Sequence, residues 1–213
     1  MASLQSGGIH MCGGSLIRDN FVLTAAHCEK VDTVVLGTHR LDEANNGMKY
    51  SVAKKCKHPS YGSETLANDI MLLKLSRKAE GKIKTIGFAN NGGVSGDCEV
   101  AGWGYTDNTS KQPSNELKKT QVTIIDWNKC KEVWTKIPDK TICAGGASTN
   151  TGFCQTDSGG PLMCGGVVVG IVSHNEKANK CDYSERSKNK FPNVYTDVFA
   201  FSQWINDQLN GEC

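Results

Sequence analysis

The sequence of 213 residues contains no run of about 18 apolar residues, so no segment has the length of a membrane-spanning helix. Its opening, MASLQSGGIH, has neither the basic n-region nor the apolar h-region of a secretory signal peptide. None of the ten cysteines falls in a C-x-x-C pair, which argues against ribbon-type zinc sites and thioredoxin chemistry. Proline is scarce, with five residues against 23 glycines, a composition that suits many tight turns.

The charge balance is close to neutral, because 24 basic residues oppose 22 acidic residues and leave a net charge of +2. A charge this small gives no reason to expect nucleic acid as a partner. Basic residues do cluster within residues 54–57 and again within residues 177–190. The ordinary interpretation is solvated loop charge, and the alternative is a site for a polyanion such as a sulfated glycan.

Cysteine content is the strongest compositional signal. Ten cysteines, an even number, predict disulfides in a chain of this size and hence an oxidising compartment. We therefore expect a secreted protein, or one stored in secretory granules, although the opening residues carry no signal peptide.

Short apolar runs, broken by turn residues, dominate the pattern. Runs such as FVLTAAHC, IMLLKL and GVVVGIVS are rich in Val, Ile and Leu and predict strands. Glycine pairs between them favour an all-β barrel or sandwich over a parallel sheet. Helical spacing of apolar residues from Val198 to Leu209 predicts one C-terminal α-helix, with Asp197 as its N-cap. A polar connector divides the chain near Ile86.

Three motifs carry chemistry. They are LTAAHC with His27, NDIMLLKL with Asp69, and TDSGGPL with Ser158. Each is weak alone, because a single His or Asp is more often structural than catalytic. Together, in the order His, Asp, Ser, they resemble the trypsin/chymotrypsin-like serine proteases, and the likeness extends from CGGSLI to QWIND. The opening MASLQ is most similar to the granzyme and mast-cell-protease branch.

The resemblance implies a fold and a domain division. We expect two six-stranded antiparallel Greek-key β-barrels with a C-terminal α-helix. Residues 1–86 would form the first barrel, with an incomplete first strand region, and carry His27 and Asp69. Residues 87–213 would form the second barrel plus the terminal helix and carry Ser158.

The same resemblance implies a mechanism. Ser158 would attack a peptide carbonyl while His27 takes its proton, Asp69 would orient His27, and the N–H groups of Thr156 and Ser158 would bind the oxyanion. The expected protein is a monomeric serine endopeptidase, made as a zymogen, that needs no cofactor. Its partners would be protein or peptide substrates and serpin-type inhibitors.

The family pattern also implies four disulfides: Cys12–Cys28, Cys98–Cys164, Cys130–Cys143 and Cys154–Cys181. Two interpretations remain for Cys56 and Cys213: a fifth bridge to the terminal helix, or two free or intermolecular thiols.

Two further sites concern modification and metal. Asn108 begins an N-glycosylation sequon, Asn-Thr-Ser. Trypsin-type calcium ligands are not expected, because Thr38, His39 and Arg40 stand where acidic residues are needed.

The first departure from the family concerns its N-terminus. In that family a freed α-amine upstream of the position of Met1 pairs with the aspartate before the nucleophile, here Asp157. We expect a truncated or mis-started gene model, which would also explain the missing signal peptide. The alternative is a genuinely shortened chain, in which Asp157 lacks its partner and the loop stays zymogen-like.

The second departure is Thr156, where the family has glycine. A β-branched residue with positive φ costs about 1–3 kcal/mol, and a peptide flip that relieves this strain would remove one oxyanion donor. We therefore predict a nucleophile that is positioned but handicapped.

The third departure is the specificity pocket, expected from Gly152, Phe153, Gln155, Ser173, His174, Asn175 and Asn193. Gly152 is not an aspartate, so cleavage after Arg or Lys loses its counter-ion, and the two asparagines favour a small or polar P1 side chain.

A rival hypothesis is a catalytically silent homologue that acts as a binding protein. A non-protease disulfide-rich β module would require all these motifs to coincide by chance.

Overall fold

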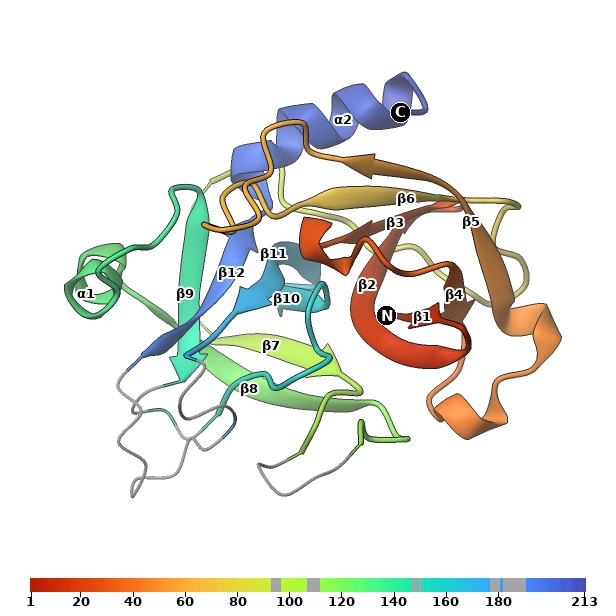
Figure 1. Ribbon diagram of the computed structural model, residues 1–213, viewed down its shortest axis with the longest axis horizontal. Helices are drawn as coiled ribbons and strands as arrows, with labels where there is room; N and C mark the ends of the chain where they lie inside the picture. Colours follow the sequence, from red (N-terminus) through yellow and green to blue (C-terminus); the bar gives the residue numbers. More distant parts are fainter. Residues whose placement is uncertain (93–96, 107–111, 147–148, 150, 177–180, 182–190) are drawn as a thin grey trace.

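Two closed barrels of antiparallel strands, each with six strands, lie side by side in the described part of the chain (Figure 1). A computed structural model describes residues 1–92, 97–106, 112–146, 149, 151–176, 181 and 191–213. The fold expected from the sequence is confirmed.

The first barrel has the strand order β1-β2-β3-β6-β5-β4. Its strands are the short apolar runs of the sequence, and polar turns separate them, as the sequence pattern predicts. They are β1 (Ala2–Ser6), β2 (Ile9–Arg18), β3 (Phe21–Thr24), β4 (Thr33–Leu36), β5 (Lys49–Lys57) and β6 (Met71–Leu75). Three 3-10 turns connect them: η1 (Ala26–Cys28), η2 (Leu41–Glu43) and η3 (Asn46–Met48).

The second barrel repeats this arrangement in the order β10-β11-β12-β9-β8-β7. Its elements are β7 (Asp97–Gly102), β8 (Lys118–Ile125), α1 (Trp127–Val133), β9 (Thr141–Gly146), β10 (Pro161–Cys164), β11 (Val167–His174) and β12 (Pro192–Asp197). Since β6 ends at Leu75 and β7 begins at Asp97, the boundary predicted near residue 86 lies in the connection between the barrels. That division stays a prediction.

The predicted C-terminal helix, α2 (Ser202–Asn210), follows the 3-10 turn η4 (Phe199–Phe201). It lies along the first barrel in Figure 1, and its buried residues Ile205 and Leu209 belong to the same apolar core as that barrel. The prediction of Asp197 as the N-cap of this helix is wrong, because Phe201 holds that position. Asp197 instead accepts from the Phe199 N–H at 3.0 Å, at the start of η4.

Helix α1 was not predicted from the sequence. It begins after Asp126, whose side chain accepts from the N–H groups of Asn128 and Lys129, which are its second and third residues. This helix carries Cys130, which is fully buried in a small cluster beside β9 and β12.

All ten cysteines form disulfides. The pairs are the four that the resemblance implies together with Cys56–Cys213, the bridge that the sequence left open. Cys12–Cys28 fixes η1 to β2, and Cys56–Cys213 ties the chain beyond α2 to β5. In the described ranges, no helix combines the length and the hydropathy that crossing a membrane requires.

Candidate active site

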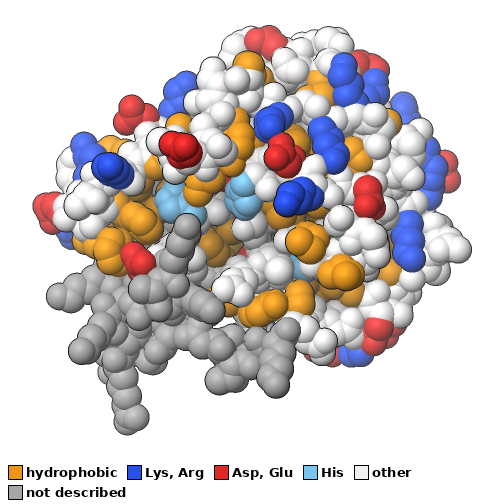
Figure 2. All heavy atoms as spheres, in the orientation of Figure 1, with side chains coloured by type: hydrophobic (Ala, Val, Ile, Leu, Met, Phe, Trp, Pro, Cys, Tyr) orange, Lys and Arg blue, Asp and Glu red, His pale blue; other side chains and the backbone are white. Residues whose placement is uncertain are grey.

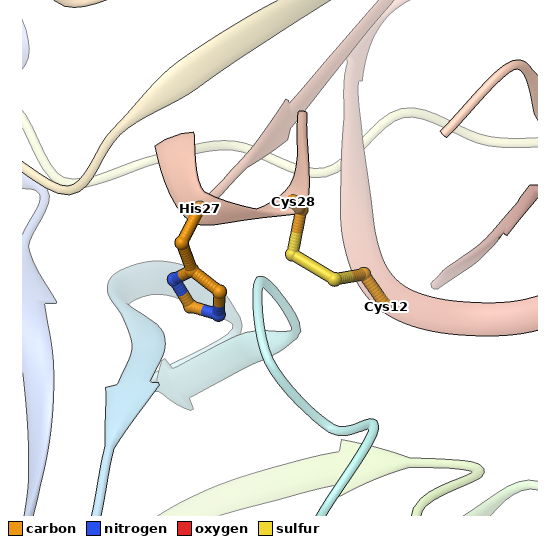
Figure 3. Close-up of side chains that lie close together, drawn as sticks. All are labelled: Cys12, His27 and Cys28. Carbon is orange, nitrogen blue, oxygen red and sulfur yellow. A yellow bond between two sulfur atoms is a disulfide. The ribbon is translucent and has the colours of Figure 1, made fainter. Parts of the chain in front are cut away.

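His27 and Asp69 meet at the edge of the first barrel. His27 lies in η1, and its ring points from this turn towards the second barrel, beside the Cys12–Cys28 disulfide (Figure 3). Its Nδ1 lies 2.7 Å from Asp69 Oδ2, and its backbone N–H donates to Asp69 Oδ1 at 3.0 Å. Because Nδ1 donates to a carboxylate, the lone pair of the neutral ring is on Nε2, the nitrogen free to take a proton.

Asp69 is fully buried and is held by both barrels. It follows Asn68, whose φ of 54° is a left-handed conformation that asparagine tolerates well. Ser173 of β11 donates its hydroxyl to Asp69 Oδ2 at 2.7 Å, and Thr196 of β12 donates to the Asp69 carbonyl at 2.9 Å. The sequence predicted Ser173 as a pocket wall and did not reveal this contact with the carboxylate.

These contacts decide the charge of Asp69. Burial alone would raise the pKa of its carboxyl, but the hydrogen bond and charge of His27 and the hydroxyl of Ser173 outweigh burial and hold the pKa below its usual value. Asp69 is therefore ionised at neutral pH and accepts the Nδ1–H of His27.

Ser158 lies in the 154–160 loop, which leads from Cys154 into β10. Its carbonyl accepts from the Gly13 N–H at 2.7 Å and lies 3.7 Å from the sulfur of Cys28, the residue after His27. Gly159 permits this approach: with φ of 76°, a Cβ there would stand 2.1 Å from the Thr24 hydroxyl. Ser158 is half-buried, and its hydroxyl makes no hydrogen bond to His27 within the part of the chain that the structure describes.

Thr156 has the positive φ that the sequence made us expect, at 68°. Its hydroxyl is buried without a hydrogen-bond partner, which adds to the cost of the conformation. The N–H groups of Thr156 and Ser158 donate to no protein group among the described residues, so both remain available to a ligand.

Two contacts fix the peptides on either side of Thr156. The Gln155 carbonyl accepts from the Tyr105 N–H at 3.0 Å, and the Thr156 carbonyl lies 3.1 Å from Nε2 of His10. His10 is 6% exposed on β2 and was missed by the sequence analysis, since no motif marks it.

Asp157 lies beside a cavity. As a whole residue it is half-buried, but its carboxylate packs so closely on Gly104 that a Cβ there would stand 2.4 Å from it. Burial raises the pKa of Asp157 to about 6, although the N–H groups of Gly104 and Cys154 donate to the carboxylate and oppose the shift. No cation pairs with it among the described residues. The cavity of about 230 Å³ is also lined by Lys118 and Gly152.

The expected specificity residues divide into two groups. Phe153 is 4% exposed and its ring packs edge-on against Tyr195 in the core of the second barrel, with centroids 5.2 Å apart. Gly152 lies next to it, and Gln155 is exposed. His174, at the end of β11, packs edge-on against Trp134, with ring centroids 5.4 Å apart.

The two expected asparagines differ in burial. Asn193 is fully buried on β12 and Asn175 is half-buried just beyond β11.

The glycosylation sequon and the basic clusters are two further predicted features. Asn108 and residues 177–180 and 182–190 of the basic cluster lie outside the described residues. Lys55 and Lys57 on β5 both contact Glu29, Lys57 through an ion pair at 2.7 Å. Figure 2 shows basic side chains to the right of a hollow that contains histidines.

Two arrangements bear on metals. Ligand atoms of Cys12, His27 and Cys28 lie within 4.8 Å of one another, but the two sulfurs are bonded together and offer no thiolate (Figure 3). In the loop where trypsins hold calcium, the guanidinium of Arg40 pairs with Asp42 at 3.0 Å, Glu43 at 3.2 Å and Glu116 at 2.7 Å. The positive charge of the Arg40 guanidinium therefore already pairs with the carboxylates of this loop.

The chain is similar in sequence and in fold to known proteins. The family model described as Trypsin matches residues 1–205. Trypsin-3 of Homo sapiens is 36% identical over 97% of this chain and 67% of its own length, and Duodenase-1 of Bos taurus is 37% identical over 96% and 80%. Granzyme-like protein 1 of Rattus norvegicus is 37% identical over 93% and 79%.

One solved structure is titled neuropsin, a serine protease expressed in the limbic system of mouse brain. It matches with a TM-score of 0.86 and 35% identity, over 98% of this chain and 93% of that chain.

Proposed function

Since the chain belongs to the trypsin family of serine proteases, we propose that it is a serine endopeptidase that cleaves peptide bonds through an acyl-enzyme on Ser158. The Ser158 hydroxyl attacks the scissile carbonyl while Nε2 of His27 takes its proton. The same proton then passes to the leaving amine, and water repeats the sequence to release the acid. Asp69 orients the ring and stabilises its charged form.

One observation carries the proposal: the N–H groups of Thr156 and Ser158 donate to no described protein group, although both lie in a well-packed loop. Backbone donors without partners cost free energy, so they persist where a ligand uses them. A tetrahedral oxyanion next to Ser158 is the ligand that this pair fits, and each such donor contributes about 10²–10³ in rate.

The cavity beside Asp157 supports a role in activation. In this family a freed α-amine pairs with the equivalent aspartate, and the cavity of about 230 Å³ has room for that amine next to the carboxylate. An ammonium there would supply the missing countercharge and lower the pKa of Asp157 from about 6. We propose that this pairing stabilises the active form of the 154–160 loop.

Substrate preference follows from the pocket residues. Gly152 offers no carboxylate to an Arg or Lys side chain, and the buried ring of Phe153 occupies volume next to it. Asn175 and Asn193 are the residues that we expect to narrow the same pocket. We propose a small or polar P1 residue and a protein or peptide substrate.

The compartment follows from the disulfides. Five bridges favour secretion or storage in secretory granules, because a reducing cytosol does not maintain them. Serpin-type inhibitors, and sulfated glycans bound by the basic residues, remain proposed partners of the same protein.

The test uses the chain preceded by a cleavable leader and an Ile-Ile-Gly-Gly start. After cleavage of the leader, a fluorophosphonate should label Ser158, and Ser158→Ala should abolish both labelling and peptide hydrolysis. A peptide library that varies P1 should be cleaved after small or polar residues and spared after Arg or Lys. An activated chain that neither reacts with the phosphonate nor cleaves any peptide would refute the proposal in favour of a binding protein.

A further inference from the structure

The carbonyl of Thr156 receives a hydrogen bond from the other barrel. Nε2 of His10, on β2, lies 3.1 Å from that oxygen, although 146 positions separate the two residues in sequence. A carbonyl only accepts, so Nε2 carries the proton and donates. The contact therefore fixes the direction of the peptide that follows the strained torsion of Thr156.

The tautomer of His10 is set from its other side. Nδ1 lies 2.9 Å from the hydroxyl of Ser3, which therefore donates to it, and Gln5 in turn donates to the Ser3 oxygen at 3.4 Å. Ser3 is fully buried, and the ring of His10 packs edge-on against Trp103 at 5.8 Å. Burial lowers the pKa of His10 to about 4, so the ring is neutral at ordinary pH and keeps this single tautomer.

Hydrogen bonds thus hold both peptide groups that flank the Cα of Thr156. The Tyr105 N–H holds the Gln155 carbonyl, so the N–H on that same peptide points the opposite way. His10 holds the next carbonyl. With both peptides fixed, the torsion between them stays at a φ of 68°, a value that a β-branched residue otherwise avoids.

From this geometry we infer that His10 is a positioning residue that keeps Thr156 left-handed and its N–H available to the oxyanion. Ser3 supports it by fixing the tautomer. The inference rests on the proposed function for its effect on rate, and on the contacts alone for its effect on the loop. It explains how the chain tolerates threonine where its family has glycine.

Kinetics of three variants test the effect on rate: His10→Leu, which removes the donor, His10→Gln, which keeps an N–H donor, and His58→Leu. His58 is the matched control, because it also packs against aromatic rings, those of Phe201 and Trp204, and its hydrogen bonds within the described residues involve no residue of the 154–160 loop. In the activated protease, His10→Leu should lower kcat about 10- to 100-fold with little change in KM. His10→Gln should keep most of kcat, and His58→Leu should keep all of it.

The decisive test combines His10→Leu with Thr156→Gly in a double-mutant cycle. Glycine adopts positive φ without strain, so the loss caused by His10→Leu should shrink at least tenfold in that background. An equal loss with threonine and with glycine would overturn the inference, because His10 would then act through something other than this torsion. An unchanged kcat in His10→Leu would overturn it as well.

Crystal structures of the same variants test the inference without any catalysis. Thr156 should turn to a negative φ in His10→Leu and keep a positive φ in His10→Gln. If φ stays positive without His10, the inference is refuted even in a fully active enzyme. If φ turns as expected in a chain that cleaves nothing, the positioning role of His10 holds and only the proposed function fails.

Discussion

His10 and Asp157 should give the stability of this protein two opposing dependences on pH. Both groups contact the 154–160 loop, and burial shifts both in the direction of the neutral form. The pKa of Asp157 is raised from 3.8 to about 6, and that of His10 is lowered from 6.5 to about 4. Each shift means that the folded and unfolded chains bind different numbers of protons between pH 4 and pH 6.5.

The signs follow from proton uptake. Below pH 6 the folded chain protonates Asp157 before the unfolded chain does, so this group stabilises the fold as pH falls. Below pH 6.5 the unfolded chain protonates a histidine that the folded chain keeps neutral, so His10 destabilises the fold. Between pH 7.5 and pH 4.5, linkage gives about 2 kcal/mol in favour of folding from Asp157 and about 2.5 kcal/mol against it from His10. The two contributions nearly cancel in the parent chain.

Single variants should separate them. The assay is equilibrium unfolding in urea at pH 4.5, 5.5, 6.5 and 7.5, in a Ser158→Ala background that prevents self-digestion. Asp157→Asn should make the change in unfolding free energy from pH 7.5 to pH 4.5 about 2 kcal/mol more unfavourable than in the parent. His10→Gln should make it about 2.5 kcal/mol more favourable. Parallel curves for either variant and the parent would show that its group is not shifted, and the burial argument would be wrong.

Four other outcomes follow from the structure. Asp69→Asn should lower kcat for peptide hydrolysis about 10⁴-fold while the positions of His27 and Ser158 stay the same. The reason is that an amide no longer holds His27 in the tautomer with its proton on Nδ1. Ser173→Ala should lower kcat about tenfold and raise the pKa of the Asp69 carboxyl, measured by NMR titration of that carboxylate. Replacing Cys56 and Cys213 by serine should cost roughly 5 kcal/mol in urea unfolding on the chain-entropy model, with kcat unchanged; a loss below 1 kcal/mol would contradict that model. Phe153→Ser should raise kcat/KM for substrates with a large P1 residue relative to P1 alanine, and an unchanged ratio would exclude the ring as a determinant.

Local patterns were enough to predict short β-strands, and the family resemblance implied their arrangement in two barrels. The run FVLTAAHC contains both a strand, Phe21–Thr24, and the turn that carries His27, and both features depend on neighbours in sequence. The C-terminal helix was equally visible, because its apolar face has a regular spacing. Even α1, which was missed, had a local signal in its cap, Asp126.

Long-range contacts could not be predicted in the same way. Ser173 reaches Asp69 across 104 positions and His10 reaches Thr156 across 146, and neither pair has a spacing or composition that marks it. The pKa of Asp157 depends on how tightly its carboxylate packs against Gly102 and Gly104, which a sequence pattern does not contain. The strain at Thr156 was predictable, but the contacts that hold it were not.

Helix α2 has a consequence for how the chain is made. The core of the first barrel includes Phe201, Ile205 and Leu209, and Cys56 bonds to Cys213. At a synthesis rate of about 5–20 residues per second, the 138 residues from Leu75 to Cys213 (213 minus 75) take about 7–28 s. For that time the nascent first barrel exposes apolar surface, and the thiol of Cys56 can react with Cys98 or Cys130 before its native partner exists. We therefore expect a thiol–disulfide isomerase that reopens such early bonds to speed correct maturation.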